Sequence, residues 1–380
     1  MSAMGGTASL AGVVGVARRV VPDPLLLLAV AGLVGLGTVM IRAATMPAPG
    51  ELSGETLRHV VYASVGGVAL LLTSRLHVSF LRRLAPLIYA GSLATLVLVL
   101  ALGSEEFGAR RWIALGGGVT VQPSEFAKIA TVIAIAAYAA DREPGARTTL
   151  VTLGLVLVSM ALVLVEPDLG TTLVLGAVWV ALLAAWGVRW RVIGGMAALA
   201  ISVLPIAFAV AVPDYQRERL EVFFNPGHDP LGSGFTMRQV EIALGAGGIT
   251  GQGIDGAPSA LDGVATRASD FAFAQLAEQM GLIGALLVVL CFALIAWRGL
   301  EAALHAPDRF SRLLAGGLTA TMVLQALMHM GVNTRLFPAT GIPLPFISTG
   351  GSALVGMCIS AGLILAVASQ RPPSDPWRER

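Results

Sequence analysis

The chain has 380 residues, of which 56% are apolar and 13% are charged, and it contains 45 glycines. This composition lies outside the range of soluble domains and is typical of a polytopic membrane protein, in which glycine is frequent. The formal net charge of +2, without a basic run interleaved with aromatic residues, argues against a nucleic-acid partner and places the expected partners in or beside a lipid bilayer.

Ten apolar windows along the chain predict ten transmembrane helices, because a helix needs about 20 apolar residues to cross roughly 30 Å of hydrocarbon. We expect one all-α membrane domain over residues 1–380, with an N-terminal segment 1–23 and a short tail 370–380. The predicted spans are 24–46, 57–74, 82–103, 122–140, 149–166, 170–188, 191–212, 271–297, 312–334 and 346–369.

The distribution of arginines predicts the orientation of these spans, since short cytoplasmic loops are enriched in basic residues. If the N-terminus is cytoplasmic, that side holds 15 of the 25 basic residues. Both termini are therefore predicted inside, and the long polar segment 213–270, between the seventh and eighth spans, lies outside. The N-terminus lacks a basic region and a cleavage site, so no removable signal peptide is expected.

The cysteines and histidines predict neither a disulfide nor a metal site. Cys291 and Cys358 lie in apolar runs, which indicates buried, unreactive thiols. The five histidines show no ligand spacing.

The first polar feature of the outer side is Arg110-Arg111-Trp112, followed by a helix start at Pro123. Glu125 and Lys128 lie three residues apart on one face of this helix. Lys128 is the only lysine, and an ammonium inside a span costs roughly 2.5–3.5 kcal/mol on insertion scales. Two interpretations stay open: a packing pair in which Lys128 snorkels to the interface, or a cation that faces a polar cavity and binds an anionic substrate.

Two tight connections on the same side carry further polar residues. In Glu166-Pro167-Asp168, Asp168 is placed to cap the following helix, and capping alone would explain it. The segment 338–352, which includes Ser348, has three prolines and three glycines and cannot form a regular helix. Because irregular backbone at membrane depth must line protein or a water-filled cavity, we expect this segment to re-enter and line a site.

The long loop contains a charged cluster with Arg217 and Arg219, and then a predicted short surface helix. This helix opens at Thr236 with capping-box spacing to Gln239 and ends at Gly245. The loop closes on Asp270, for which the residues alone favour a helix N-cap.

Several motifs together resemble the SEDS family (shape, elongation, division and sporulation), and they cover nearly the whole chain. Residues 229–232 and 242–248 resemble the elongation-type RodA subfamily more than the division-type FtsW subfamily. The motifs are Glu166-Pro167-Asp168-Leu169-Gly170-Thr171, Asp229-Pro230-Leu231-Gly232-Ser233-Gly234, Ser269-Asp270-Phe271-Ala272-Phe273 and Pro343-Leu344-Pro345-Phe346-Ile347-Ser348-Thr349-Gly350-Gly351-Ser352.

The resemblance implies a glycosyltransferase that polymerises lipid II at the outer face of the bacterial cytoplasmic (inner) membrane, with a class B penicillin-binding protein as partner. Asp270 is similar to the family's essential loop aspartate, and this reverses the preference for a simple cap. Glu125, Lys128 and Asp168 fall on other family motif positions.

The chemistry of glycosyl transfer fits these residues. A carboxylate can take the proton of the acceptor hydroxyl, and cations can neutralise the departing lipid pyrophosphate. Our hypothesis makes Asp270 the base, while Arg111, Lys128 and either Arg217 or Arg219 neutralise phosphate charge. Glu125, Asp168 and Ser348 complete the predicted substrate-binding set.

A divalent cation, Mg²⁺ or Mn²⁺, is a further expectation for the pyrophosphate, with no protein ligands assigned. The alternative functions are an FtsW-like septal glycosyltransferase and a transporter that flips a lipid-linked precursor. A transporter would carry charges near the bilayer midplane and repeated halves. The predicted charges cluster instead at the outer helix ends, and no repeat is detected.

Overall fold

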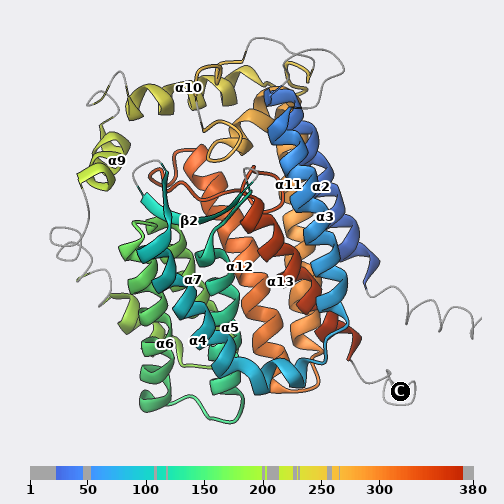
Figure 1. Cartoon of the computed structure of the whole chain (residues 1–380), viewed down its shortest axis with the longest axis vertical. Helices are drawn as coiled ribbons and strands as arrows, with labels where there is room; N and C mark the ends of the chain where they lie inside the picture. The colour runs from blue at the N-terminus through green and yellow to red at the C-terminus, as the bar shows by residue number, and fades with distance from the viewer. Residues whose placement is uncertain are drawn as a thin grey trace, which may run out of the picture.

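The protein folds as a bundle of long apolar helices with polar loops and short helices gathered at one end (Figure 1). The structure is a computed structural model. It describes residues 23–45, 53–106, 109–116, 119–198, 202, 214–225, 229, 232–254, 259–264 and 266–370.

The bundle consists of nine helices of 18 residues or more within the described part of the chain. Eight of them are long and apolar enough to cross a membrane, and the ninth, α5, carries the buried Glu125 and Lys128. The nine helices are α2 (Pro24–Thr45), α3 (Gly54–Ser74), α4 (Val78–Leu102), α5 (Pro123–Ala140), α6 (Ala146–Val165), α7 (Leu169–Trp186), α11 (Ala272–Leu304), α12 (Arg309–Asn333) and α13 (Gly351–Ser369).

These nine helices match nine of the ten predicted spans and confirm the all-α membrane class. Of the remaining span, 191–212, only residues up to 198 and Ser202 are described, and they are helical. The predicted termini 1–23 and 370–380 lie almost wholly outside the described residues. The last helix begins at Gly351, five residues later than predicted, because the proline- and glycine-rich segment before it stays irregular.

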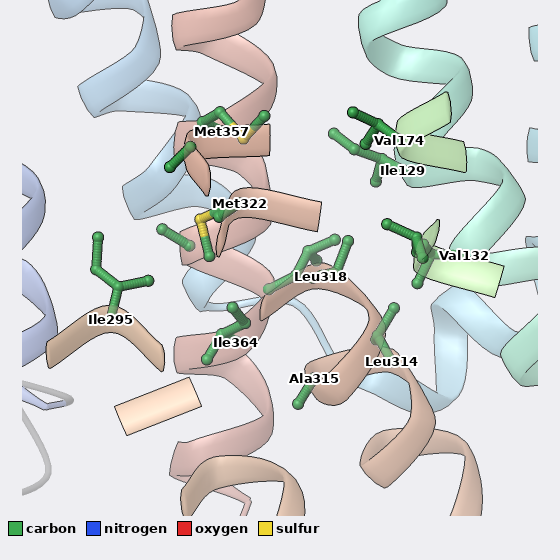
Figure 2. Packing of buried hydrophobic residues seen from close by; sticks show 14 of the residues in the cluster. Ile129, Val132, Val174, Ile295, Leu314, Ala315, Leu318, Met322, Met357 and Ile364 are labelled. Carbon is green, nitrogen blue, oxygen red and sulfur yellow. The ribbon is translucent and has the colours of Figure 1, made fainter. Parts of the chain in front are cut away.

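α12 and α13 form the centre of the bundle. α13 packs against α3, and α12 packs against α5, α7, α11 and α13. Leu318, Met322 and Ile364 lie in the apolar core between these helices (Figure 2). Two-thirds of the apolar 18-residue window of α12 is buried inside the protein, and the buried share of the corresponding window of α13 is larger. These two helices therefore present little surface to lipid.

The end of the bundle where the polar loops gather, named the outer end after the predicted orientation, has two elements that hydrophobic periodicity did not predict correctly. The connection between α4 and α5 folds into a three-stranded antiparallel sheet of β1 (Ser104–Glu106), β2 (Ala109–Gly116) and β3 (Val119–Val121). The surface helix α10 (Ser233–Ala246) begins three residues before the predicted Thr236, and Gly245 lies inside it, so the predicted capping box is wrong.

α10 and the shorter α9 (Asp214–Phe224) lie across the end of the bundle, above β2 (Figure 1). Their apolar faces form a small second core with the turn before α11, through Val222, Val240, Leu261 and Phe271. This core fixes the long loop over the helix ends, where the predicted site residues lie.

Candidate functional site

A cavity of about 170 Å³ lies under α9 and α10, and Asp270 is the only carboxylate among its lining residues. Polar or charged side chains contributed by four segments face it. The lining residues are Arg219, Val222, Phe223, Thr236, Met237, Thr266, Asp270, Phe271, Val332, Arg335, Ala339 and Gly341.

Asp270 and Arg219 approach each other beside Gly341. A Cβ built on Gly341 would lie 3.7 Å from Asp270 Oδ2 and 3.6 Å from Arg219 Nη1. Gly341 has a φ of +68°, a conformation that side chains with a Cβ rarely adopt. Glycine at this position therefore allows the irregular segment to take this backbone conformation beside the carboxylate and the guanidinium.

The carboxyl of Asp270 is partly buried, and this burial raises its pKa above the ordinary value. The positive charge of Arg219, a hydrogen bond with Ser269 and the charge of Arg111 act in the opposite direction, while the charge of Asp168 raises the pKa further. A carboxylate with a raised pKa is a better proton acceptor than one in water, as a general base requires.

Asp270 does not cap α11. The helix begins at Ala272, its N-cap is Phe271, and no side-chain cap bond is made. The backbone N–H of Asp270 donates to Thr266 O at 2.9 Å, which folds the preceding residues into a turn. The predicted N-cap alternative is therefore wrong, and the carboxylate faces the cavity.

A polar stripe on α12 fixes this turn and the irregular segment 338–350. Gln325 Nε2 donates to Pro343 O at 3.0 Å, and His329 Nδ1 contacts Ile342 O at 2.7 Å. Asn333 donates to Asp270 O at 3.1 Å and accepts from Ala274 N at 3.0 Å. The three side chains follow the i, i+4, i+8 spacing of one helix face, a signal that was present in the sequence and was not used.

Ser348 holds the same turn from the other side. Its hydroxyl donates to Ser269 O at 2.8 Å and accepts from Leu344 N at 2.8 Å. Thr349 N donates to Ala268 O at 3.1 Å. Ser348 is 2% exposed, so the structure places it as a support of the Asp270 turn and not as a lining residue of the cavity.

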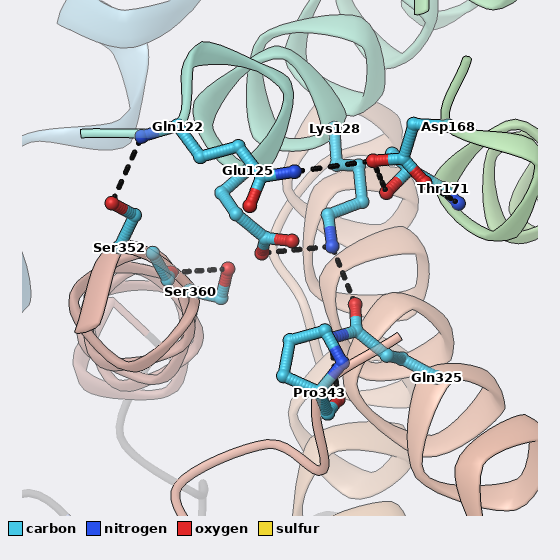
Figure 3. Close-up of polar contacts among 10 residues, drawn as sticks. Gln122, Glu125, Lys128, Asp168, Thr171, Gln325, Pro343, Ser352 and Ser360 are labelled. Atoms are coloured by element: carbon cyan, nitrogen blue, oxygen red, sulfur yellow. Dashed lines mark hydrogen bonds and ion pairs between the residues drawn. The ribbon is translucent and has the colours of Figure 1, made fainter. Parts of the chain in front are cut away.

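Glu125 and Lys128 form an ion pair at 2.8 Å inside the bundle, and both side chains are at most 2% exposed (Figure 3). Lys128 Nζ also donates to Gln325 Oε1 at 2.5 Å. We call Glu125, Lys128 and Gln325 the Lys128 network. Lys128 does not snorkel to the interface, because these partners neutralise and hydrogen-bond its ammonium within the protein.

Asp168 caps α7, as predicted. Its Oδ1 accepts from Thr171 N at 3.0 Å, while its Oδ2 accepts from Thr171 Oγ1 at 2.8 Å and from Gln122 Nε2 at 3.1 Å (Figure 3). Gln122 in turn connects to α13 through Ser352 Oγ. Asp168 therefore ties together the outer ends of α5, α7 and α13.

Glu166 was not predicted as a site residue, although it stands two positions before Asp168. It is 0% exposed, and neither carboxylate oxygen has a hydrogen-bond partner. The pKa of Glu166 is raised to about 8, chiefly by burial and also by the charge of Asp168, while the charge of Arg111 acts in the opposite direction. At neutral pH this carboxyl is mostly protonated.

Arg111, on β2, acts electrostatically on both Glu166 and Asp270. Its guanidinium lies 5.5 Å from the ring centre of Trp112, and its buried Nε has no hydrogen-bond partner. Of the two predicted arginines of α9, Arg219 lines the cavity and Arg217 does not. Arg219, Arg111 and Asp168 therefore all act electrostatically on Asp270, whereas Lys128 is held by Glu125 and Gln325.

No three His, Cys, Asp or Glu side chains cluster as metal ligands in the described part of the chain. These residues do not fit a divalent cation held by the protein alone.

The family model of the FtsW/RodA/SpoVE cell cycle proteins matches residues 24–372. The chain belongs to this family. Peptidoglycan glycosyltransferase MrdB of Escherichia coli K12 is 33% identical over 353 residues, which cover 92% of this chain and 94% of that protein. A probable peptidoglycan glycosyltransferase FtsW of Trichlorobacter lovleyi is 35% identical over 360 residues, 91% of this chain and 93% of the relative.

Solved structures of the family share the fold. A chain of a peptidoglycan synthase complex, studied for its coordination of polymerization and crosslinking, superposes with a TM-score of 0.77 at 30% identity and covers 91% of this chain and 97% of its own length. The rod shape determining protein RodA of Thermus thermophilus superposes with a TM-score of 0.68 at 28% identity, over 92% of this chain and 97% of that chain. The family match and the apolar helices make this a multi-pass membrane protein.

Proposed function

We propose that the chain is a peptidoglycan glycosyltransferase that polymerises lipid II, an undecaprenyl-pyrophosphate-linked disaccharide-peptide, at the outer face of the cytoplasmic membrane. The observation that carries the mechanism is the carboxyl of Asp270 in a cavity opposite Arg219, within the electrostatic field of Arg111. The relatives named peptidoglycan glycosyltransferase support the reaction class.

Asp270 accepts the proton of the acceptor sugar hydroxyl as the hydroxyl oxygen forms the new bond to the donor sugar's anomeric carbon. The bond between that carbon and the pyrophosphate oxygen breaks, and the negative charge passes to the pyrophosphate. Arg219 and Arg111 neutralise this charge, which stabilises the transition state. Ser348 and Asn333 hold the backbone on which Asp270 sits.

We assign the divalent cation, Mg²⁺ or Mn²⁺, to the pyrophosphate of the substrate and not to the protein. When bound, it supplies positive charge to the leaving group. No step of the mechanism above depends on it.

The elongation-type assignment and the partner are part of the same proposal. We infer that the chain works in cell elongation with a class B penicillin-binding protein that cross-links its product. The similarity to MrdB and to a chain of a peptidoglycan synthase complex supports this assignment, and septal synthesis of the FtsW type is the alternative.

The test is polymerisation of lipid II by the purified protein reconstituted in vesicles. Asp270→Asn should lower the rate by about 10²–10⁴, the contribution expected of a general base. The matched control is Asp141→Asn, which alters an exposed carboxylate paired with Arg82 in the turn between α5 and α6, and it should polymerise at the wild-type rate. Near-wild-type activity of Asp270→Asn would sink the base assignment, and translocation of lipid II without chain growth would favour the transporter.

A further inference from the structure

Glu166 and Arg111 are two ionisable side chains that share one buried region, and their polar atoms are not paired. Both oxygens of Glu166 and Nε of Arg111 are buried and lack hydrogen-bond partners. Arg111 makes no ion pair within 4.0 Å among the described residues. A buried polar atom without a partner is costly because it has lost its hydrogen bonds to water, so such a group is expected where a ligand or a change of charge state uses it.

The turn that carries Glu166 is connected to the cavity through a short segment. At the start of α7, a Cβ built on Gly170 would lie 3.0 Å from Thr340 O and would also clash with Ile342. The next residue of that segment, Gly341, lies beside both Asp270 and Arg219. The buried hydroxyl of Thr340 also has no partner. The start of α7, just after Glu166, therefore packs against the segment that lines the cavity with Ala339 and Gly341.

The charges that face Glu166 come from β2 and from the cap of α7. Arg111 and Asp168 are the charges that act on it. Glu125 and Lys128 of α5 neutralise each other at 2.8 Å. The outer half of α4 and the segment 336–350 contain no ionisable residue. Arg111 is thus the cation that an ionised Glu166 would attract.

We propose that Glu166 is a positioning residue that remains uncharged in the working enzyme and thereby leaves the Arg111 guanidinium available to a phosphate of the lipid-linked substrate. Because Glu166 is 0% exposed, it acts through Arg111 and does not touch the substrate. When Glu166 loses its proton to solvent, its carboxylate competes with the phosphate for Arg111. By linkage, a bound phosphate makes the proton on Glu166 harder to remove.

This inference rests on the proposed function, since it concerns the substrate's pyrophosphate, but its test does not require polymerisation. The purified full-length protein is titrated with farnesyl pyrophosphate, and farnesol serves as the uncharged probe. For the wild type, the Kd of farnesyl pyrophosphate should rise about tenfold between about pH 7 and about pH 9.5, because the ionised carboxylate of Glu166 neutralises the positive charge of Arg111. The Kd of farnesol should not change.

Glu166→Gln keeps the shape of the neutral acid and cannot ionise, so its Kd for farnesyl pyrophosphate should stay constant over the same range. Glu143→Gln is the matched control and should behave like the wild type. Glu143 lies in the turn between α5 and α6, its side chain is 82% exposed, and it pairs with Arg309 at the start of α12. If Glu166→Gln does not fold, Arg111→Gln provides the second test. It should bind farnesyl pyrophosphate weakly at every pH and without the alkaline loss.

The inference is overturned if the wild type shows no alkaline rise of Kd, or if either Glu166→Gln or Arg111→Gln retains that rise. These outcomes are distinct from failure of the proposed function. A protein that binds farnesyl pyrophosphate as expected but does not polymerise lipid II would contradict the proposed function and leave the role of Glu166 intact.

Discussion

The Lys128 network and the group formed by Arg111, Glu166 and Asp270 both bury charge near the outer end of the bundle, and they differ in how that charge is satisfied. Lys128 has a carboxylate at 2.8 Å and an amide oxygen at 2.5 Å. Arg111 and Glu166 have buried polar atoms without partners, and Asp270 faces a cavity. Lys128, neutralised by partners inside the bundle, is a structural cation, whereas Asp270, which has a raised pKa and faces the cavity, is the candidate functional group.

The largest expected effect that distinguishes the Asp270 group from the Lys128 network is the pH dependence of polymerisation. A base must be ionised, so kcat/KM should rise with pH through the raised pKa of Asp270 and fall about tenfold for each pH unit below it. Rates of lipid II polymerisation measured from about pH 5 upward check this. An acidic limb that survives in Asp270→Asn would assign it to another group.

Removal of Lys128 should affect stability more than chemistry. Lys128→Met leaves Glu125 buried without its cation, and breaking such a pair costs about 3–5 kcal/mol in the free energy of unfolding. Chemical unfolding in detergent measures this cost. Adding Glu125→Gln to Lys128→Met removes the second charge and should recover most of the loss.

The opposite outcome would change the interpretation of this network. If Lys128→Met unfolds like the wild type but no longer binds farnesyl pyrophosphate, Lys128 is a substrate cation, as one of the two sequence interpretations held.

A smaller effect is expected from Asn333→Leu, which keeps the branched shape and the number of heavy atoms of the side chain, although leucine is bulkier, and removes the bonds to Asp270 O and Ala274 N. A displacement of the reacting carboxylate by roughly 1 Å should lower kcat about tenfold to hundredfold. The KM and the acidic limb of the pH profile should persist, because the base itself remains. Thr334→Val, which removes only the bonds of the C-cap hydroxyl to Met330 O and Gly331 O in the last turn of α12, should leave kcat unchanged.

The sequence determined the class of fold because the length of apolar windows is a local property. Nine of ten predicted spans correspond to described helices. The cap at Asp168 and the irregular segment before α13 were predicted for the same reason, since capping and proline act over a few residues. Asp270 could be selected only through family motifs, because the residues alone favoured a cap.

Only the tertiary structure decided which polar residues meet. Lys128 and Gln325 form a hydrogen bond although they lie 197 positions apart in the sequence. Ser348 and Ser269, which also form a hydrogen bond, lie 79 positions apart. No local pattern encodes such contacts. The burial of Glu166, which decides its charge at neutral pH, depends on tertiary packing around the α6–α7 turn, where Gly170 contacts Thr340 and Ile342. Periodicity specifies which helices form, but the desolvation and pairing of charges arise only when those helices pack together.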